Sequence, residues 1–168
     1  MRYRLDVVAP TVAEAVRYAG GWMFDRVMAG WEVNVLVAGS EDVRALQILG
    51  AETVDFESTI AAGDDQPHPQ ALAVSADLVA RDARVREGVL RALDHGMTGV
   101  ALWGDSRPVQ LDREVDSVQH KLSSAARMFK AQALAAAAVT DTSVGPVETF
   151  RSGAMNRPPI GADLVPAG

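Results

Sequence analysis

The sequence predicts an α/β fold in three layers, an open sheet of about five mostly parallel strands with helices on both faces. Two observations favour this class. Short apolar segments of strand character alternate with segments of helical period, and glycines close several of the helical segments. Right-handed crossovers then place the first strand in the middle, the next two on one side and the last two on the other. We describe the expected sheet as Rossmann-like but degenerate.

The first strand, Arg4 to Val8, leads through Ala9-Pro10-Thr11 into a helix. Thr11 and Glu14 form a capping-box pattern at the start of that helix. Gly20 and Gly21 lie inside it, where two glycines cost about 1–2 kcal/mol. We interpret them by packing of the helix on its own sheet. The alternative is close approach of another helix, from this chain or from a partner.

The remaining elements of the sheet follow in order, each bounded by turn residues. We expect strands at 31–37, 53–56, 71–75 and 98–103, helices at 41–49 and 76–94, and a polar loop at 57–70. Together with the first strand and helix they form an α/β domain over residues 1–111.

Two segments lie outside this alternation of strands and helices. Residues 112–139 predict one long amphipathic helix, packed on the domain or on a partner, and residues 140–168, rich in turn residues, predict an irregular or disordered tail. Apolar residues at spacings of three and four give the helix one seam, which is our candidate interface. Its members are Val115, Val118, Leu122, Ala125, Phe129 and Ala133.

Composition narrows the classes of function. The chain of 168 residues has no cysteine, which excludes disulfides, thiolate metal sites and cysteine nucleophiles. The net charge of −6 argues against general binding to nucleic acid or to anionic membranes. The N-terminal residues have no apolar stretch typical of a signal peptide, so we expect a cytoplasmic protein, and the Ala- and Arg-rich usage suggests a bacterial genome.

Polar residues at the ends of the predicted strands are the candidate ligand-binding groups. In open α/β sheets ligands bind beyond the carboxyl ends of the strands. The candidates there are Thr11, Ser40, Ser75, Asp77, Asp105 and Arg107. The competing interpretation is structural, because Ser, Thr and Asp at these positions are ordinary helix caps and turn residues.

Motifs that would identify a cofactor are missing. The first loop, Ala9-Pro10-Thr11, has no glycine and no lysine where a phosphate-binding loop would stand. His68, His95 and His120 are scattered without the spacing of a ligand pair, so we expect neither a metal nor a cofactor. Arginines on the segment 76–94 alternate with acidic residues, which is typical of a solvated face; contact with nucleic acid is the weaker alternative.

These observations lead to two hypotheses about function. The first is a non-catalytic cytoplasmic protein that acts through protein–protein contacts, as a homo-oligomer, because catalytic motifs are missing and a seam helix is present. The alternative is an enzyme or sensor that binds a small molecule or nucleotide at the carboxyl ends of the strands, with Asp77 and Asp105 as its ionisable pair.

Overall fold

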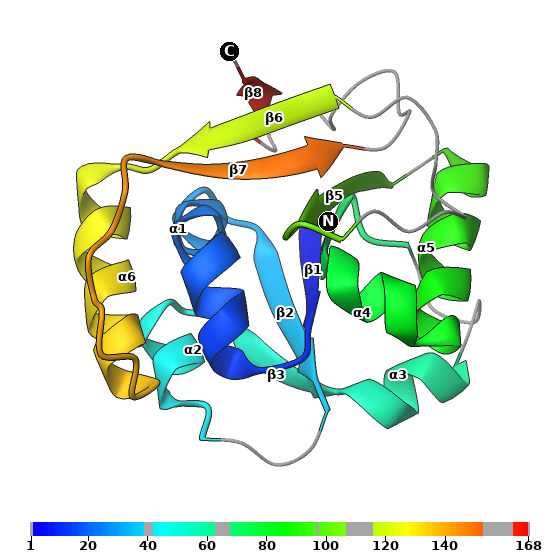
Figure 1. Cartoon of the computed structure of the whole chain (residues 1–168), viewed down its shortest axis with the longest axis horizontal. Helices are drawn as coiled ribbons and strands as arrows, with labels where there is room; N and C mark the ends of the chain where they lie inside the picture. The colour runs from blue at the N-terminus through cyan, green and yellow to red at the C-terminus, as the bar shows by residue number, and fades with distance from the viewer. Residues whose placement is uncertain are drawn as a thin grey trace.

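A computed structural model of the chain describes residues 2–38, 42–62, 68–96, 98–106, 116–152 and 163–167. Within these ranges the chain forms a single sheet of eight strands with helices on both faces (Figure 1). The strands are β1 (Arg4–Ala9), β2 (Glu32–Val37), β3 (Glu52–Asp55), β4 (Ala71–Ser75), β5 (Gly99–Trp103), β6 (Asp116–Lys121), β7 (Val147–Ser152) and β8 (Val165–Pro166). The helices are α1 (Val12–Met28), α2 (Arg44–Ile48), α3 (Phe56–Ala62), α4 (Ala76–Arg81), α5 (Ala83–His95) and α6 (Ser124–Ala136).

The sheet has a parallel part and an antiparallel part. Its order is β3-β2-β1-β4-β5-β7-β6-β8. The first five strands in the chain pair in parallel, with β1 in the middle as expected. The three later strands add antiparallel pairs beyond β5. The expectation of about five mostly parallel strands is therefore corrected to one mixed sheet of eight, and a Rossmann-like arrangement is not confirmed.

The long helix expected over residues 112–139 is wrong. In its place the described residues form the strand β6 and then the helix α6, which begins after Ser123. Val118 and Leu122 are four residues apart. This spacing fits one turn of a helix, but it also fits an extended chain, in which every second residue lies on the same face. The Ser123 hydroxyl accepts a hydrogen bond from the Ala126 N–H and caps α6.

Other expected boundaries move as well. The tail expected to be irregular contains β7 and β8, and the loop expected at 57–70 contains most of α3. The helix expected at 76–94 is two helices, because the Asp82 carboxylate accepts from the N–H groups of Arg84 and Val85 and starts α5 anew.

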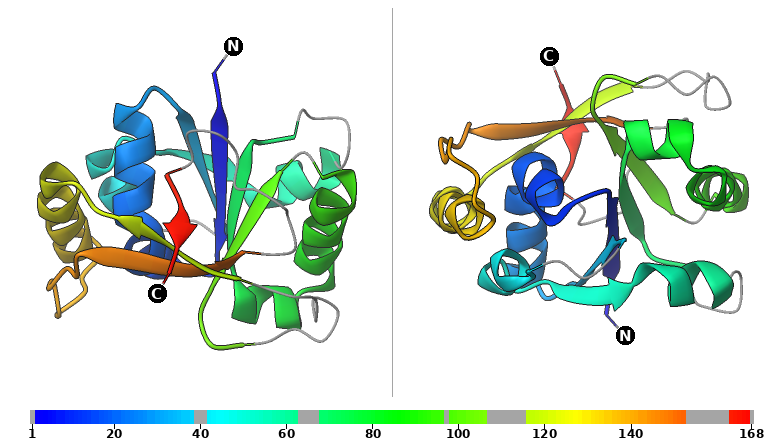
Figure 2. Two further views of the ribbon diagram at one scale, coloured as in Figure 1. Left: turned by 90° about the horizontal axis from the view of Figure 1, so that it is seen from above. Right: turned by 60° about the horizontal axis from the view of Figure 1, so that its bottom comes forward.

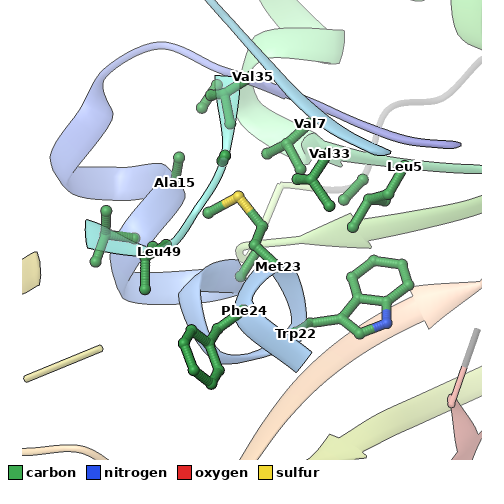
Figure 3. Packing of buried hydrophobic residues seen from close by; sticks show 14 of the residues in the cluster. Leu5, Val7, Ala15, Trp22, Met23, Phe24, Val33, Val35 and Leu49 are labelled. Carbon is green, nitrogen blue, oxygen red and sulfur yellow. The ribbon is translucent and has the colours of Figure 1, made fainter. Parts of the chain in front are cut away.

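The two faces of the sheet carry separate apolar cores. One core lies under α1, α2 and α6 and extends to β6 and β7. Figure 3 shows Met23 of α1 over Val7 and Val33, while Phe24 points away from the strands. Phe24 stacks instead on Phe129 of α6, with ring centroids 4.7 Å apart. The second core lies under α3, α4 and α5 and is built from aliphatic side chains and Phe56.

Helix α1 bends at its two glycines. In Figure 1 its first part is seen from the side and its second part nearly end-on, and the turned views of Figure 2 reverse this. The N–H groups of Gly21 and Trp22 donate to the Glu148 carboxylate at 2.8 and 2.7 Å. A carboxylate in this position caps a helix N-terminus, so the second part of α1 begins there like a separate helix.

The two glycines leave room for another part of the same chain. A Cβ atom on Gly21 would lie 2.3 Å from the Leu122 side chain, and one on Gly20 would lie 3.4 Å from the Lys130 side chain. Leu122 directly precedes α6 and Lys130 belongs to it. These contacts support the alternative interpretation of the glycines, which is close approach of a second helix rather than packing on the sheet alone.

Glu148 and Lys130 form a buried ion pair beside this bend. Their side chains are 2.7 Å apart, and the residues are only 4% and 6% exposed. Burial raises the pKa of Glu148, while Lys130 and the two N–H groups of α1 act against that rise. The pair therefore joins α1, α6 and β7 at one point.

Among the described residues, the helices are all too short or too polar to cross a membrane.

Candidate functional site

Three neighbouring strands carry all of the candidate ligand-binding residues that the structure describes. Strands β1, β4 and β5 are adjacent and parallel, so their carboxyl ends meet at one edge of the sheet. Thr11 follows β1, Ser75 ends β4 with Asp77 just beyond it, and Asp105 follows β5. Ser40 and Arg107 lie outside the described residues.

Thr11 and Ser75 cap helices. The Thr11 hydroxyl accepts from the Glu14 N–H at 3.1 Å, and the Ser75 hydroxyl accepts from the Leu78 N–H at 3.3 Å. Ser75 is buried, whereas Thr11 is exposed. The structural interpretation thus accounts for one hydrogen bond of each hydroxyl, and Thr11 keeps a face toward solvent.

Asp77 connects the loops that follow β4 and β5. Its carboxylate accepts a hydrogen bond from the Ser106 hydroxyl at 3.4 Å and lies 3.3 Å from the Arg81 guanidinium one turn along α4. The Asp77 side chain is 63% exposed, and Asp105, next to Ser106, is exposed too. Two carboxylates and one hydroxyl therefore face solvent at this edge of the sheet.

The loop after β5 is held by a residue from the antiparallel part of the sheet. Arg151 of β7 donates from Nη2 to the carbonyl oxygens of Gly104 and Ser106, at 2.8 and 2.6 Å. Gly104 has φ of +94°, a conformation that favours glycine. Strand β7 thus fixes the position of the loop that carries Asp105 and Ser106.

An aromatic pair adjoins this loop. The indole N–H of Trp103 donates to the Glu14 carboxylate at 3.0 Å. The Tyr18 ring, 40% exposed, stacks on the Trp103 ring with centroids 6.1 Å apart. Glu14 therefore takes part in a contact between α1 and β5 as well as in the start of its own helix, and Tyr18 offers a flat apolar surface to solvent.

Sequence reasoning missed Glu14, Tyr18, Trp103 and Arg151 as members of this edge. Glu14 and Tyr18 carried a usable signal, since they lie off the apolar stripe of a helix that starts at the edge. Arg151 carried none, because its partners lie 45 and 47 residues earlier in the chain.

The candidate interface residues are placed differently from the expectation. Val118, Leu122 and Ala133 are buried in the core under α1 and α6, so they are not available to another chain. The reason is that β6 and α6 fold back over α1. Ala125 and Phe129 are exposed, and Val115 lies outside the described residues.

The described part of the chain contains no group of three or more His, Asp or Glu side chains placed to hold a metal ion.

Comparison with known proteins finds crystal structures of deacetylases that have a similar fold. No family model and no curated protein sequence matches the chain. A crystal structure of the A40926 pseudoaglycone deacetylase matches with a TM-score of 0.61 at 14% identity, over 94% of this chain and 100% of that one. A deacetylase–teicoplanin complex matches with a TM-score of 0.65 at 13% identity, over 89% and 98%. The zinc-inhibited form of teicoplanin deacetylase matches with a TM-score of 0.62 at 12% identity, over 89% and 97%.

The likeness overturns the first hypothesis about function. At these identities it shows the fold alone, but that fold is one that enzymes use. The expectation of a non-catalytic protein also depended on the seam helix, and three of its seam residues, Val118, Leu122 and Ala133, are buried within the chain. The non-catalytic interpretation is therefore wrong, and the alternative of a small-molecule site at the strand ends fits better.

Proposed function

We propose that the chain is an enzyme that hydrolyses an acyl group from a small molecule, with its site at the carboxyl ends of β1, β4 and β5. The observation that carries the proposal is the contact between Asp77 and Ser106, which joins two strand-end loops beside the Glu14–Trp103 pair. The fold shared with deacetylases supports the class of reaction. Because those neighbours are deacetylases, we propose that the group removed is an acetyl group and that an amine nitrogen carries it.

The residues at the edge suit the parts of such a reaction. An ionised Asp77 takes a proton from water as the water oxygen bonds to the acyl carbon. When the C–N bond breaks, the same proton passes to the amine nitrogen, so the products are a carboxylic acid and a free amine. The Ser106 hydroxyl donates a hydrogen bond within this group, Asp105 supplies a second carboxylate, and Tyr18 offers an apolar face for the substrate.

The test is acetate release from a panel of N-acetylated amino sugars and N-acetylated amino acids, followed by proton NMR. We expect Asp77→Asn to lower the rate by about a hundredfold, in the range for loss of a general base. Asp105→Asn tests the second carboxylate in the same assay. Glu52→Gln is the matched control, because Glu52 is an exposed carboxylate at the start of β3, at the opposite edge of the sheet.

Two outcomes contradict the proposal. One is that no compound in the panel releases acetate; the other is turnover that Asp77→Asn leaves unchanged.

A sensor that binds its ligand without turnover is the second candidate function, favoured by the exposure of both carboxylates. It predicts a thermal shift with a nucleotide or another small molecule that Asp77→Asn abolishes, without acetate release. A homo-oligomer and a cytoplasmic location stay predictions.

A further inference from the structure

The described residues also line a cavity that lies away from the carboxyl edge of the sheet. It has a volume of about 160 Å³ and lies between α3 and α5, over the sheet face that these helices share. Its floor is aliphatic, from Val8, Leu36, Leu72 and Val74, and its walls are Ile60 on one side and Val85, Val89 and Ala92 on the other. An engineered apolar cavity of about 150 Å³ accommodates benzene, so this one has room for a ring-sized apolar body.

Three residues of α5 line the cavity in a row. Arg84, Gly88 and Arg91 follow one another at spacings of four and three, which places them on one side of the helix. The side chain of Arg84 is 49% exposed, and Arg91 is exposed as well, so the two guanidinium groups stand at the opening. Gly88 lies between them, where the helix backbone is bare.

Gly88 has no packing reason to be glycine. A Cβ atom added there would meet nothing within 4 Å, and its backbone conformation does not require glycine. In a helix interior glycine is less favourable than alanine. The space that a side chain would take is part of the cavity, so the glycine keeps the cavity open between the two arginines.

Arginines outnumber carboxylates among the residues that line the cavity. Arg4, Arg84 and Arg91 line it together with one carboxylate, Asp6, which Arg4 contacts at 3.1 Å. Arg84 also pairs with Glu57 at 2.7 Å and with Asp82 at 3.5 Å. Arg84 and Glu57 are both largely solvent-exposed, and an exposed ion pair stabilises little, so an incoming anion can exchange with Glu57.

We propose that this cavity binds a small organic acid, a carboxylate on an aromatic or branched aliphatic body. The body fills the space between Ile60 and Val89, and the carboxylate lies over Gly88 between Arg84 and Arg91. Charge-assisted hydrogen bonds from arginine suit a planar carboxylate, whereas an amine of the same shape meets two like charges. The site is separate from the strand-end site proposed above and does not depend on it.

The test is calorimetric titration of the full chain with benzoate, benzyl alcohol and benzylamine, probes of one shape and different charge. We expect benzoate to bind at least about tenfold more tightly than benzylamine, because the like charges repel the amine. Arg84→Gln and Arg91→Gln should each weaken benzoate about five- to tenfold. Arg44→Gln, an exposed arginine on α2 under the other face, is the matched control and should change nothing.

Gly88→Leu separates ligand binding from stability. It should abolish benzoate binding while the melting temperature stays level or rises, because leucine is the better helix former. Ile60→Phe narrows the cavity from the opposite wall and serves as the second variant. Undiminished benzoate binding in both variants contradicts the site. Benzylamine binding as tightly as benzoate, or no benzoate binding at millimolar concentration, contradicts the proposed ligand.

Discussion

The two faces of the sheet are stabilised in different ways. The face under α1, α2 and α6 buries ionisable side chains in pairs, Glu148 with Lys130 and His120 with Asp25. The face under α3, α4 and α5 packs aliphatic side chains and keeps a cavity. A buried pair depends on both partners, because removal of one leaves the other ionisable group buried without its partner. An aliphatic core tolerates the exchange of side chains of similar volume more easily. We therefore expect small changes to destabilise the first face more than the second.

The largest expected effect comes from the buried ion pair. Lys130→Met keeps the apolar stem of the side chain but removes the cation, so the Glu148 carboxylate stays buried without it. We expect a loss of about 3–5 kcal/mol in the free energy of unfolding, measured by urea denaturation. Lys121→Met, at an exposed lysine at the end of β6, is the control and should change stability by less than about 0.5 kcal/mol.

A double variant checks the cause of that loss. Adding Glu148→Gln to Lys130→Met removes the buried charge, and the amide oxygen can still accept from one N–H of α1. Part of the lost stability should therefore return. A double variant less stable than Lys130→Met alone contradicts the view that the uncompensated carboxylate causes the damage.

The close approach at the bend of α1 gives the next effect. Gly21→Ala places a Cβ atom 2.3 Å from the Leu122 side chain, so leucine must move. We expect a loss of about 1–3 kcal/mol, the range for overpacking a core, measured by thermal unfolding. Leu122→Ala in the Gly21→Ala background should remove the overlap. If Gly21→Ala leaves stability unchanged, the approach is looser than the structure describes.

Acid sensitivity tests the second buried pair. Burial acts to raise the pKa of Asp25, but hydrogen bonds from Ser123 and His120 outweigh it and hold the pKa below its ordinary value of 3.8. As pH falls, the unfolded chain binds this proton first, so the stability from Asp25 is complete above that ordinary value and is lost as pH falls through the folded-state pKa.

Asp25→Asn should therefore cost about 1–2 kcal/mol at pH 7 and flatten the loss of stability below about pH 4. Urea midpoints at several pH values measure both effects. Asp42→Asn is the control, because Asp42 also has a pKa lowered by hydrogen bonds, from Arg44, but its side chain is exposed to solvent. An acid-induced loss as steep in Asp25→Asn as in the natural chain contradicts the assignment.

The smallest effect has the opposite sign and belongs to the other face. Gly88→Ala should stabilise the chain by about 0.5–1 kcal/mol, because alanine is the better helix former and its Cβ meets nothing within 4 Å. Glycine-to-alanine substitution thus destabilises at position 21 and stabilises at position 88. Thermal unfolding of the two variants side by side measures this difference. Effects of the same sign would remove the contrast between the faces.

The parallel half of the fold was predictable because its pattern is local. The strands β1, β2, β4 and β5 are apolar runs, and α1 starts at the predicted Thr11 cap. Strands β6 and β7 were missed because each has an ionisable residue at an inward position, His120 and Glu148. A period of two in apolar residues cannot show when inward positions hold ionisable residues whose partners lie elsewhere in the chain.

The candidate site was predictable to the same extent. The topology places Ser75, Asp77 and Asp105 at strand ends, and strand ends can be located from the sequence. The contacts that organise them cannot, because Glu14 and Trp103 are 89 residues apart and carry no shared motif. The cavity under α5 was equally hidden, since Gly88 and its flanking arginines have the composition of an ordinary solvated helix.

The carboxylate that caps the second part of α1 has a consequence for the order of folding. Glu148 lies 127 residues after Gly21, so that part of the first helix acquires its final hydrogen bonds only after β7 has been synthesised. At ordinary rates of synthesis the delay on the ribosome is on the order of ten seconds. Nascent chains that stop before β7 therefore carry an unfinished first helix, and completion of the fold depends on an encounter between distant parts of the chain, which is intrinsically slow.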